Sequence, residues 1–131
     1  MQEKEAIIRQ GELIKERIQE IYSILAKAES VSVAGGLFSS GMTADYMDKA
    51  QKKTGELKPE LESFEQMLAG IDGVELDCDA KEVFKMGNGL FTYRMVSNTA
   101  AHIAVIERIR NGQANLRVIK KQIELVIEKL S

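Results

Sequence analysis

The longest regular apolar pattern in the chain runs from Thr99 to Leu130. Its apolar residues alternate in steps of three and four, the spacing of a helix that buries one stripe along its length. The stripe consists of Val105, Ile109, Gly112, Leu116, Ile119, Ile123, Val126 and Leu130. Further apolar residues flank it, namely Ile103, Ile106, Val118, Leu125 and Ile127. The resulting face is wider than a two-stranded coiled coil needs, so we expect this helix to pack against two neighbours and to be the element that the others cover.

Two earlier segments show the same helical spacing. The first predicted helix covers about residues 2–29, and the second runs from about residue 40 or 43 to about residues 68–71. Gly55 and Pro59 interrupt the second pattern. Because proline removes a backbone hydrogen bond and crowds the preceding turn, we expect a kink near residues 53–59 or two successive helices. The Gly- and Ser-rich segment Ser30–Gly41 predicts a turn or loop, with a short extended segment at Val31–Val33 as an alternative.

The segment before the last helix gives two conflicting signals. Asn88-Gly89 lies between β-prone residues and predicts a β-hairpin over about residues 82–96. Alternatively, the last helix extends backwards to Phe91, although Ser97, Asn98 and Thr99 favour a start at Thr99 because such residues cap helices. We favour the hairpin. The predicted fold is therefore mainly α, a single domain (residues 1–131) built as a bundle of three long helices, with this small hairpin between the second and third.

Composition excludes several classes of function. The chain of 131 residues, 44% hydrophobic and 29% charged, suits one soluble globular domain. Its net charge of -2 disfavours nucleic-acid binding, and no apolar run is long enough for membrane insertion. The N-terminal residues carry no secretory signal, and the single cysteine, Cys78, cannot form an internal disulfide. We expect a cytoplasmic protein or one exported by a non-classical route.

No residue pattern predicts a catalytic, metal or cofactor site. We interpret the single histidine, His102, as structural, and Cys78 as inert because two flanking aspartates disfavour its thiolate. The acidic residues between Asp72 and Glu82 lack the order of a calcium-binding loop, so we interpret them as a solvated loop. The glycines near residues 35–41 do not match a phosphate-binding loop. The basic residues of the last helix lack an aromatic platform, so we expect a solvated face paired with acids of the first helix.

One segment, Leu37–Ala50, resembles the turn and second helix of the helical hairpins of type VII (ESX-type) secretion. In that family a Trp-x-Gly turn is followed by small and aromatic residues. Here Phe38 and Gly41 stand roughly where Trp-x-Gly would be, and Ala44 and Tyr46 follow. The resemblance covers about the first half of the chain, without a tryptophan and without the closing Tyr-x-x-x-Asp/Glu signal. It therefore implies a helper or targeting partner of such a system.

The surplus of apolar surface on the last helix predicts a non-enzymatic protein that binds another protein. With the resemblance, the expected role is that of an adaptor, chaperone-like or targeting factor of a type VII-like secretion system. We expect the partner to be helical, and we expect no cofactor. The predicted partner-binding residues are Phe38, Tyr46, Ile103, Ile106, Val118 and Ile127. The alternative hypothesis is a homo-oligomeric coiled-coil scaffold. A metal-dependent or hydrolytic enzyme is the third hypothesis.

Overall fold

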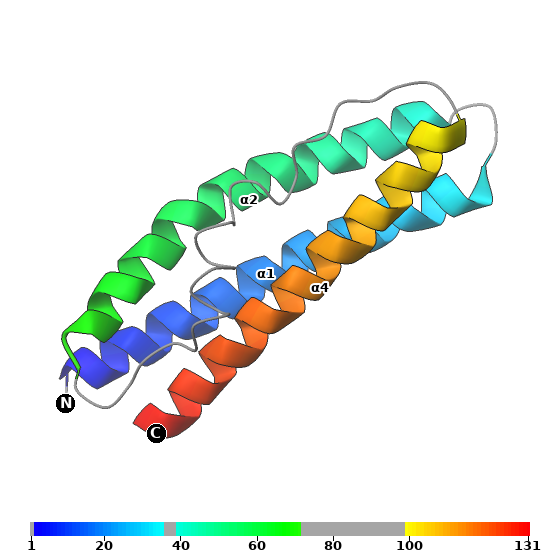
Figure 1. Ribbon diagram of the computed structural model, residues 1–131. Coiled ribbons are helices and arrows are strands. Elements are labelled where there is room, and N and C mark those ends of the chain that lie inside the picture. The colour runs from blue at the N-terminus through cyan, green and yellow to red at the C-terminus, as the bar shows by residue number, and fades with distance from the viewer. Residues whose placement is uncertain (1, 36–38, 72–98) are drawn as a thin grey trace.

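The computed structural model describes residues 2–35, 39–71 and 99–131, which form a bundle of three long helices (Figure 1). The helices are α1 (Gln2–Ala34), α2 (Ser39–Ala69) and α4 (Thr99–Leu130). Figure 1 shows that α1 runs antiparallel to both α2 and α4. The predicted mainly α bundle is confirmed, and the predicted bounds of the last helix, Thr99 and Leu130, are those of α4.

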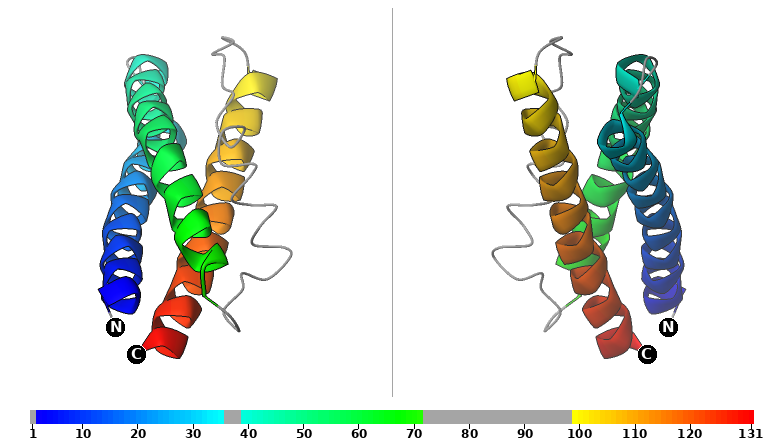
Figure 2. Two further views of the ribbon diagram at one scale, coloured as in Figure 1. Left: turned by 90° about the vertical axis from the view of Figure 1, so that its left-hand side faces the viewer. Right: turned by 90° about the vertical axis from the view of Figure 1, so that its right-hand side faces the viewer.

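The central helix of the bundle is α1. It packs against both α2 and α4, whereas in the described ranges no Cα atom of α2 lies within 8 Å of one in α4. Figure 2 shows α2 and α4 diverging toward the end of the bundle where α4 begins. The expectation that Thr99–Leu130 packs between two neighbours was therefore wrong, because α1 has that position. The extra apolar width of α4 serves partly to contact α1, as described below.

Each helix buries one stripe with the alternating three- and four-residue spacing of a heptad repeat. The stripe of α1 consists of Ile7, Gly11, Ile14, Ile18, Ile21, Leu25, Ala28 and Ser32. That of α2 consists of Thr43, Met47, Ala50, Thr54, Leu57, Leu61, Phe64 and Leu68. That of α4 consists of Ile109, Gly112, Leu116, Ile119, Ile123, Val126 and Leu130. The buried apolar residues of all three helices form one core cluster, so the helices share a single hydrophobic core.

The first helix is longer than its sequence predicts. Residues of Ser30–Ala34 are helical, so both the loop and the extended segment expected there were wrong. The reason is that Ser32 follows Leu25 by seven residues, continues the buried stripe, and is only 2% exposed. The helix ends where Gly35 adopts a φ of 70° and donates its N–H to the Val31 carbonyl at 3.3 Å. A glycine in this left-handed conformation is a common helix terminator.

The second helix continues through Pro59 without interruption, so the alternative of two successive helices was wrong. Proline lacks the N–H that would bond the carbonyl of Gly55 four residues earlier. Both residues are exposed, so water can satisfy that carbonyl, and the open surface relieves crowding by the ring. Helix α4 likewise continues through Asn111-Gly112. The predicted hairpin over 82–96, the acidic residues of 72–82 and Cys78 lie outside the described residues.

Candidate functional site

The helices α1 and α4 approach closely at Gly11. A Cβ atom at Gly11 would lie 3.1 Å from Cδ1 of Ile127 and 3.2 Å from Cγ2 of Ile123. Contacts this short are tighter than packed side chains normally tolerate, so the absence of a side chain at Gly11 sets the distance between the helices. The sequence alone offers no sign of this role, because an isolated glycine in a helix is also compatible with simple tolerance.

A regular row of polar contacts follows the edge of the α1–α4 interface. Three α1 residues spaced by seven, Lys15, Tyr22 and Glu29, face three α4 residues with the same spacing in the opposite direction. The outer two contacts are ion pairs: Lys15 Nζ lies 3.9 Å from a carboxylate oxygen of Glu124, and Arg110 Nε lies 2.9 Å from one of Glu29. The expected pairing of α4 cations with acids of the first helix is thus confirmed for Arg110.

The middle contact of this row has no carboxylate. Here the guanidinium carbon of Arg117 lies 5.4 Å from the centre of the Tyr22 ring, a cation–π contact. One turn further along α4, Lys120 Nζ donates a hydrogen bond of 3.4 Å to the neutral amide oxygen of Gln19. Neither cation forms an ion pair with a carboxylate of the described residues. The centre of the row therefore carries positive charge that the outer pairs do not.

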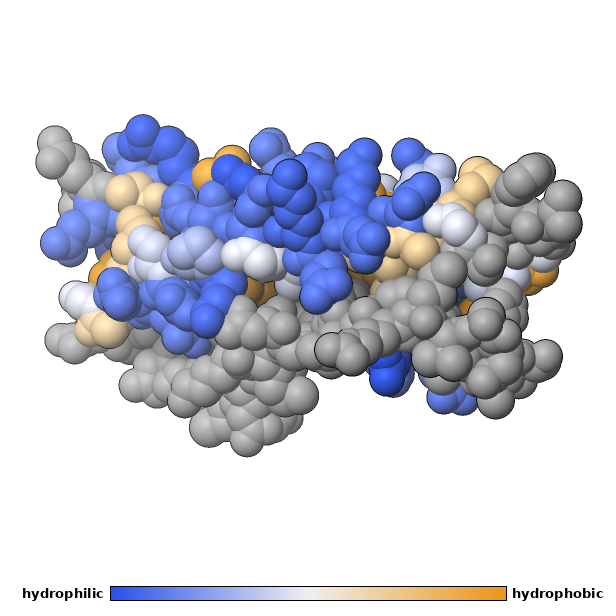
Figure 3. All heavy atoms as spheres, turned by 90° about the horizontal axis from the view of Figure 1, so that it is seen from above, coloured by the Kyte–Doolittle hydropathy of each residue, from blue (hydrophilic) through white to orange (hydrophobic). Residues whose placement is uncertain are grey.

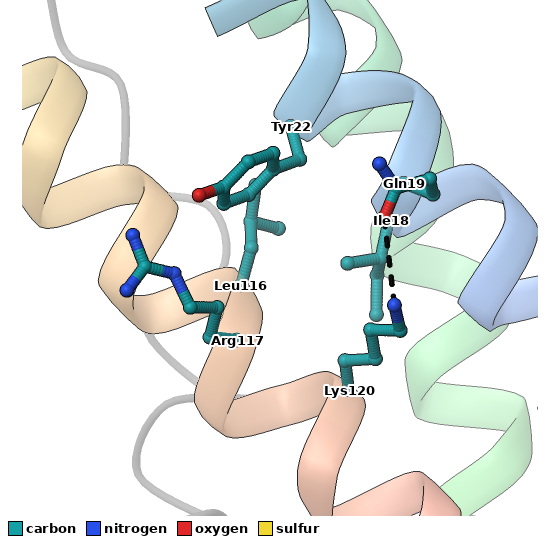
Figure 4. Close-up of a pocket in the computed structure, with 6 residues that line it drawn as sticks. All are labelled: Ile18, Gln19, Tyr22, Leu116, Arg117 and Lys120. Carbon is teal, nitrogen blue, oxygen red and sulfur yellow. Dashed lines mark hydrogen bonds between the residues drawn. The ribbon is translucent and has the colours of Figure 1, made fainter. Parts of the chain in front are cut away.

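A pocket of about 190 Å³ opens at this point between α1 and α4 (Figure 4). Its floor is apolar, because Ile18 and Leu116 are 1% and 0% exposed. Figure 4 shows Lys120 extending from α4 to Gln19 of α1, to which it is bonded, and Arg117 on the other side of the pocket, where the Tyr22 ring lies. We refer to this site as the Arg117 pocket. It is lined by Ile18, Gln19, Tyr22, Leu116, Arg117 and Lys120.

The other edge of α1 is neutralised by ion pairs to α2. Arg17 Nε lies 2.8 Å from a carboxylate oxygen of Glu60, and Lys53 Nζ lies 2.7 Å from one of Glu20. The hydrogen bond and charge of Lys53 lower the pKa of Glu20 below its ordinary value of 4.5. The Lys53–Glu20 pair lies at the surface and contributes little to stability, whereas the contacting atoms of Arg17 and Glu60 are buried; both pairs help to fix the register of the two helices.

The residues predicted to bind a partner do not gather into one surface. Tyr46 of α2 and Ile127 of α4 are half-buried and pack against the core cluster. Ile106 is also half-buried, whereas Val118 is 40% exposed. The side chains of Phe38 and Ile103 lie outside the described residues. Of the predicted set, the described residue that presents most apolar surface to solvent is therefore Val118.

Val118 has an apolar neighbour on the same face of α4. Leu125 follows it by seven residues, two helical turns away, and is 39% exposed. The remaining large exposed apolar residues of the described chain, Leu13, Val33 and Met42, lie on α1 and α2. The face seen in Figure 3 is largely hydrophilic, with its apolar residues in small separate areas. We call Val118 and Leu125 the outer apolar pair of α4.

Comparisons with known proteins add no functional assignment to these residues. No family model matches the chain, and no curated protein or solved structure shows significant similarity to it. Within the part of the chain that the structure describes, no helix is long and apolar enough to cross a membrane. The same residues contain no group of three His, Cys, Asp or Glu side chains that could hold a metal ion. The candidate site therefore consists of the outer apolar pair and the adjacent Arg117 pocket.

Proposed function

We propose that this protein is a non-enzymatic partner-binding protein that uses the outer face of α4. The observation that carries the proposal is the outer apolar pair, because Val118 and Leu125 share one face while the buried stripe of the same helix is already occupied by the bundle. Exposed apolar residues that cluster and are surrounded by polar ones are typical of protein-interaction sites. Arg117 and Lys121 provide such polar surroundings.

The specific version of this proposal is an adaptor, chaperone-like or targeting factor of a type VII-like secretion system, acting in the cytoplasm on a helical partner. The antiparallel α1–α2 hairpin supports this version, because it has the architecture that the resemblance implies. One feature differs from the family pattern: Gly41 lies in the first turn of α2, and Gly35 ends α1. The hairpin, rather than the turn glycine, is the part of the resemblance on which we rely.

The proposal is tested by capture of a partner from the native host with the wild-type chain and with Val118→Asp. A charge at the centre of an apolar contact leaves a buried carboxylate without a partner, so we expect at least a tenfold loss of the captured protein. The matched control is Val33→Asp, which introduces the same change at a 62% exposed position near the end of α1. Equal capture by both variants and the wild type would contradict the proposal.

The homo-oligomer hypothesis is distinguished by light scattering of the same proteins. A substitution in the buried stripe, such as Ile119→Asp, could not distinguish loss of self-association from unfolding. Ile119 is 0% exposed, so a charge there would unfold the bundle. Val118→Asp leaves the core intact. A dimer that this variant converts to a monomer would favour self-association through α4, whereas a monomer in both cases favours a different protein as the partner.

A further inference from the structure

We propose that the segment which binds α4 is acidic, and that one of its carboxylates binds in the Arg117 pocket. This inference rests on the proposed function and names the chemistry of the partner. The starting observation is the interrupted row of contacts along the α1–α4 edge. Tyr22 occupies the position at which Lys15 and Glu29, one heptad to either side, form ion pairs with α4.

The interruption leaves two cations at one opening. Among the residues that the structure describes, Arg117 contacts the face of the Tyr22 ring and Lys120 contacts a neutral amide oxygen at 3.4 Å, and neither forms an ion pair. Arg and Lys donate charge-assisted hydrogen bonds to carboxylates that are about twice as strong as neutral ones. A carboxylate supplied at this opening would complete the row that the acids of the described helices leave open.

The size of the Arg117 pocket suits one side chain. Its volume of about 190 Å³ is below the roughly 300–1,000 Å³ of typical small-molecule sites. The floor formed by Ile18 and Leu116 is apolar, so it can contact the methylene groups of a glutamate while the carboxylate remains at the opening. The dimensions favour an acidic side chain over a free cofactor.

The location links the pocket to the proposed binding face. Arg117 directly precedes Val118 in α4, so the two side chains point about 100° apart around the helix, and a segment that lies over Lys121 between them can contact both. The charge of α4 also favours an acidic partner. Helix α4 carries six Lys and Arg residues and three Glu residues, whereas the whole chain has a net charge of -2. This local positive charge attracts an acidic, amphipathic segment.

The test uses a labelled synthetic peptide of glutamate and leucine in amphipathic helical order, and a matched peptide with glutamine in place of glutamate. We expect the glutamate peptide to bind at least tenfold more tightly by fluorescence anisotropy, and to shift the Arg117 Nε–H resonance. Equal affinity of the two peptides, or no binding of the glutamate peptide, would overturn the inference.

Two variants locate the carboxylate. Arg117→Gln should weaken binding of the glutamate peptide at least tenfold, because it removes the charge from the pocket. Lys129→Gln is the matched control, since it removes one exposed charge from the last turn of the same helix without lining the pocket, and it should weaken binding less than threefold. Equal weakening by both variants would show general charge attraction and overturn the site. Displacement of the peptide by inorganic phosphate at matched ionic strength would overturn its assignment to a carboxylate.

The same variants separate this inference from the proposed function. If Val118→Asp abolishes capture of the host partner and Arg117→Gln does not, the carboxylate site is wrong and the α4 binding face stands. If neither variant changes capture, the carboxylate site and the α4 binding face are both wrong. If both variants reduce capture and the glutamate peptide competes with the partner, both are supported.

Discussion

Gly11 of α1 and Ile127 of α4 are so close that a Cβ at Gly11 would lie 3.1 Å from Cδ1 of Ile127. The sequence suggested Ile127 as surplus apolar surface available to a partner. In the structure, Ile127 instead packs against the core cluster. It lies opposite Gly11, the one position of the α1 stripe that has no side chain. The apolar width of α4 therefore has two roles, with Ile127 turned toward α1 and Val118 exposed.

The first prediction concerns this contact. Gly11→Val should destabilise the protein by about 1–3 kcal/mol, because the added methyl groups must displace Ile127 or Ile123. The measurement is urea denaturation followed by circular dichroism. Gly55→Ala is the control: nothing lies within 4 Å of its Cβ position, so it should stabilise α2 by up to about 1 kcal/mol. Wild-type stability of Gly11→Val would contradict the close approach.

The second prediction compares two apolar residues of α4. Ile123→Ala should cost about 2–5 kcal/mol in the free energy of unfolding, because Ile123 is 0% exposed and its removal leaves a cavity. Leu125→Ala should cost less than about 1 kcal/mol, since that side chain is 39% exposed and partly solvated in the folded state. Similar costs for the two variants would mean that α4 is rotated about its axis relative to the bundle described above.

The third prediction concerns the end of α1. Gly35→Ala should destabilise the protein by about 1–2 kcal/mol, because its φ of 70° is unfavourable for a residue with a Cβ. Gly41→Ala, in the first turn of α2 with nothing within 4 Å of its Cβ position, should be neutral or stabilising. Thermal or urea unfolding of the two variants checks the difference, and a stabilised Gly35→Ala would place the end of α1 elsewhere.

The fourth prediction concerns pH. Lys53 holds the pKa of Glu20 below 4.5 in the folded protein, so the contribution of this pair to stability is present above pH 4.5 and is lost as the pH falls through the lowered pKa. Lys53→Met should raise the pKa of Glu20 toward 4.5 in an NMR titration and should remove this part of the acid dependence. An unchanged Glu20 titration would show that the pair does not persist in solution.

The fifth prediction reverses the interruption in the α1–α4 row. Tyr22→Glu places a carboxylate opposite Arg117, in the position that Glu29 holds opposite Arg110. Stability should fall by about 1–3 kcal/mol, because Tyr22 packs partly against the core cluster and an exposed ion pair compensates little. The glutamate peptide should bind at least tenfold more weakly. Tyr22→Phe, which retains the ring against Arg117, should preserve peptide binding. Undiminished binding by Tyr22→Glu would contradict a carboxylate in the Arg117 pocket.

The sequence predicted elements where local and long-range signals agree. The course of α4 was correct because its apolar spacing continues to Leu130, and its start was correct because the sequence Ser-Asn-Thr favours a helix that begins at Thr99 over one that begins at Phe91. The end of α1 was misjudged because Ser-Val-Ser-Val followed by two glycines has the local character of a strand and turn. The register of Ser32 on the buried stripe outweighed that local preference.

The candidate site could be predicted only in part. The sequence predicted the exposure of Val118, because this residue lies beside the apolar stripe and not within it. Tyr22 and Gln19 were missed, because their relation to Arg117 and Lys120 depends on how α1 and α4 align across about a hundred residues of chain. The heptad spacing defines which side of each helix is buried, but it leaves that alignment and the choice of central helix undetermined.

The position of α1 between two helices whose backbones do not approach each other also determines how the bundle can open. Separating α2 or α4 breaks one helix–helix interface, whereas releasing α1 breaks both. Amide hydrogens in the middle of α1 should therefore exchange with solvent only on global unfolding, while those of α4 can exchange through a partial opening. The helix that carries the proposed binding face is thus one that can move without disrupting the α1–α2 hairpin.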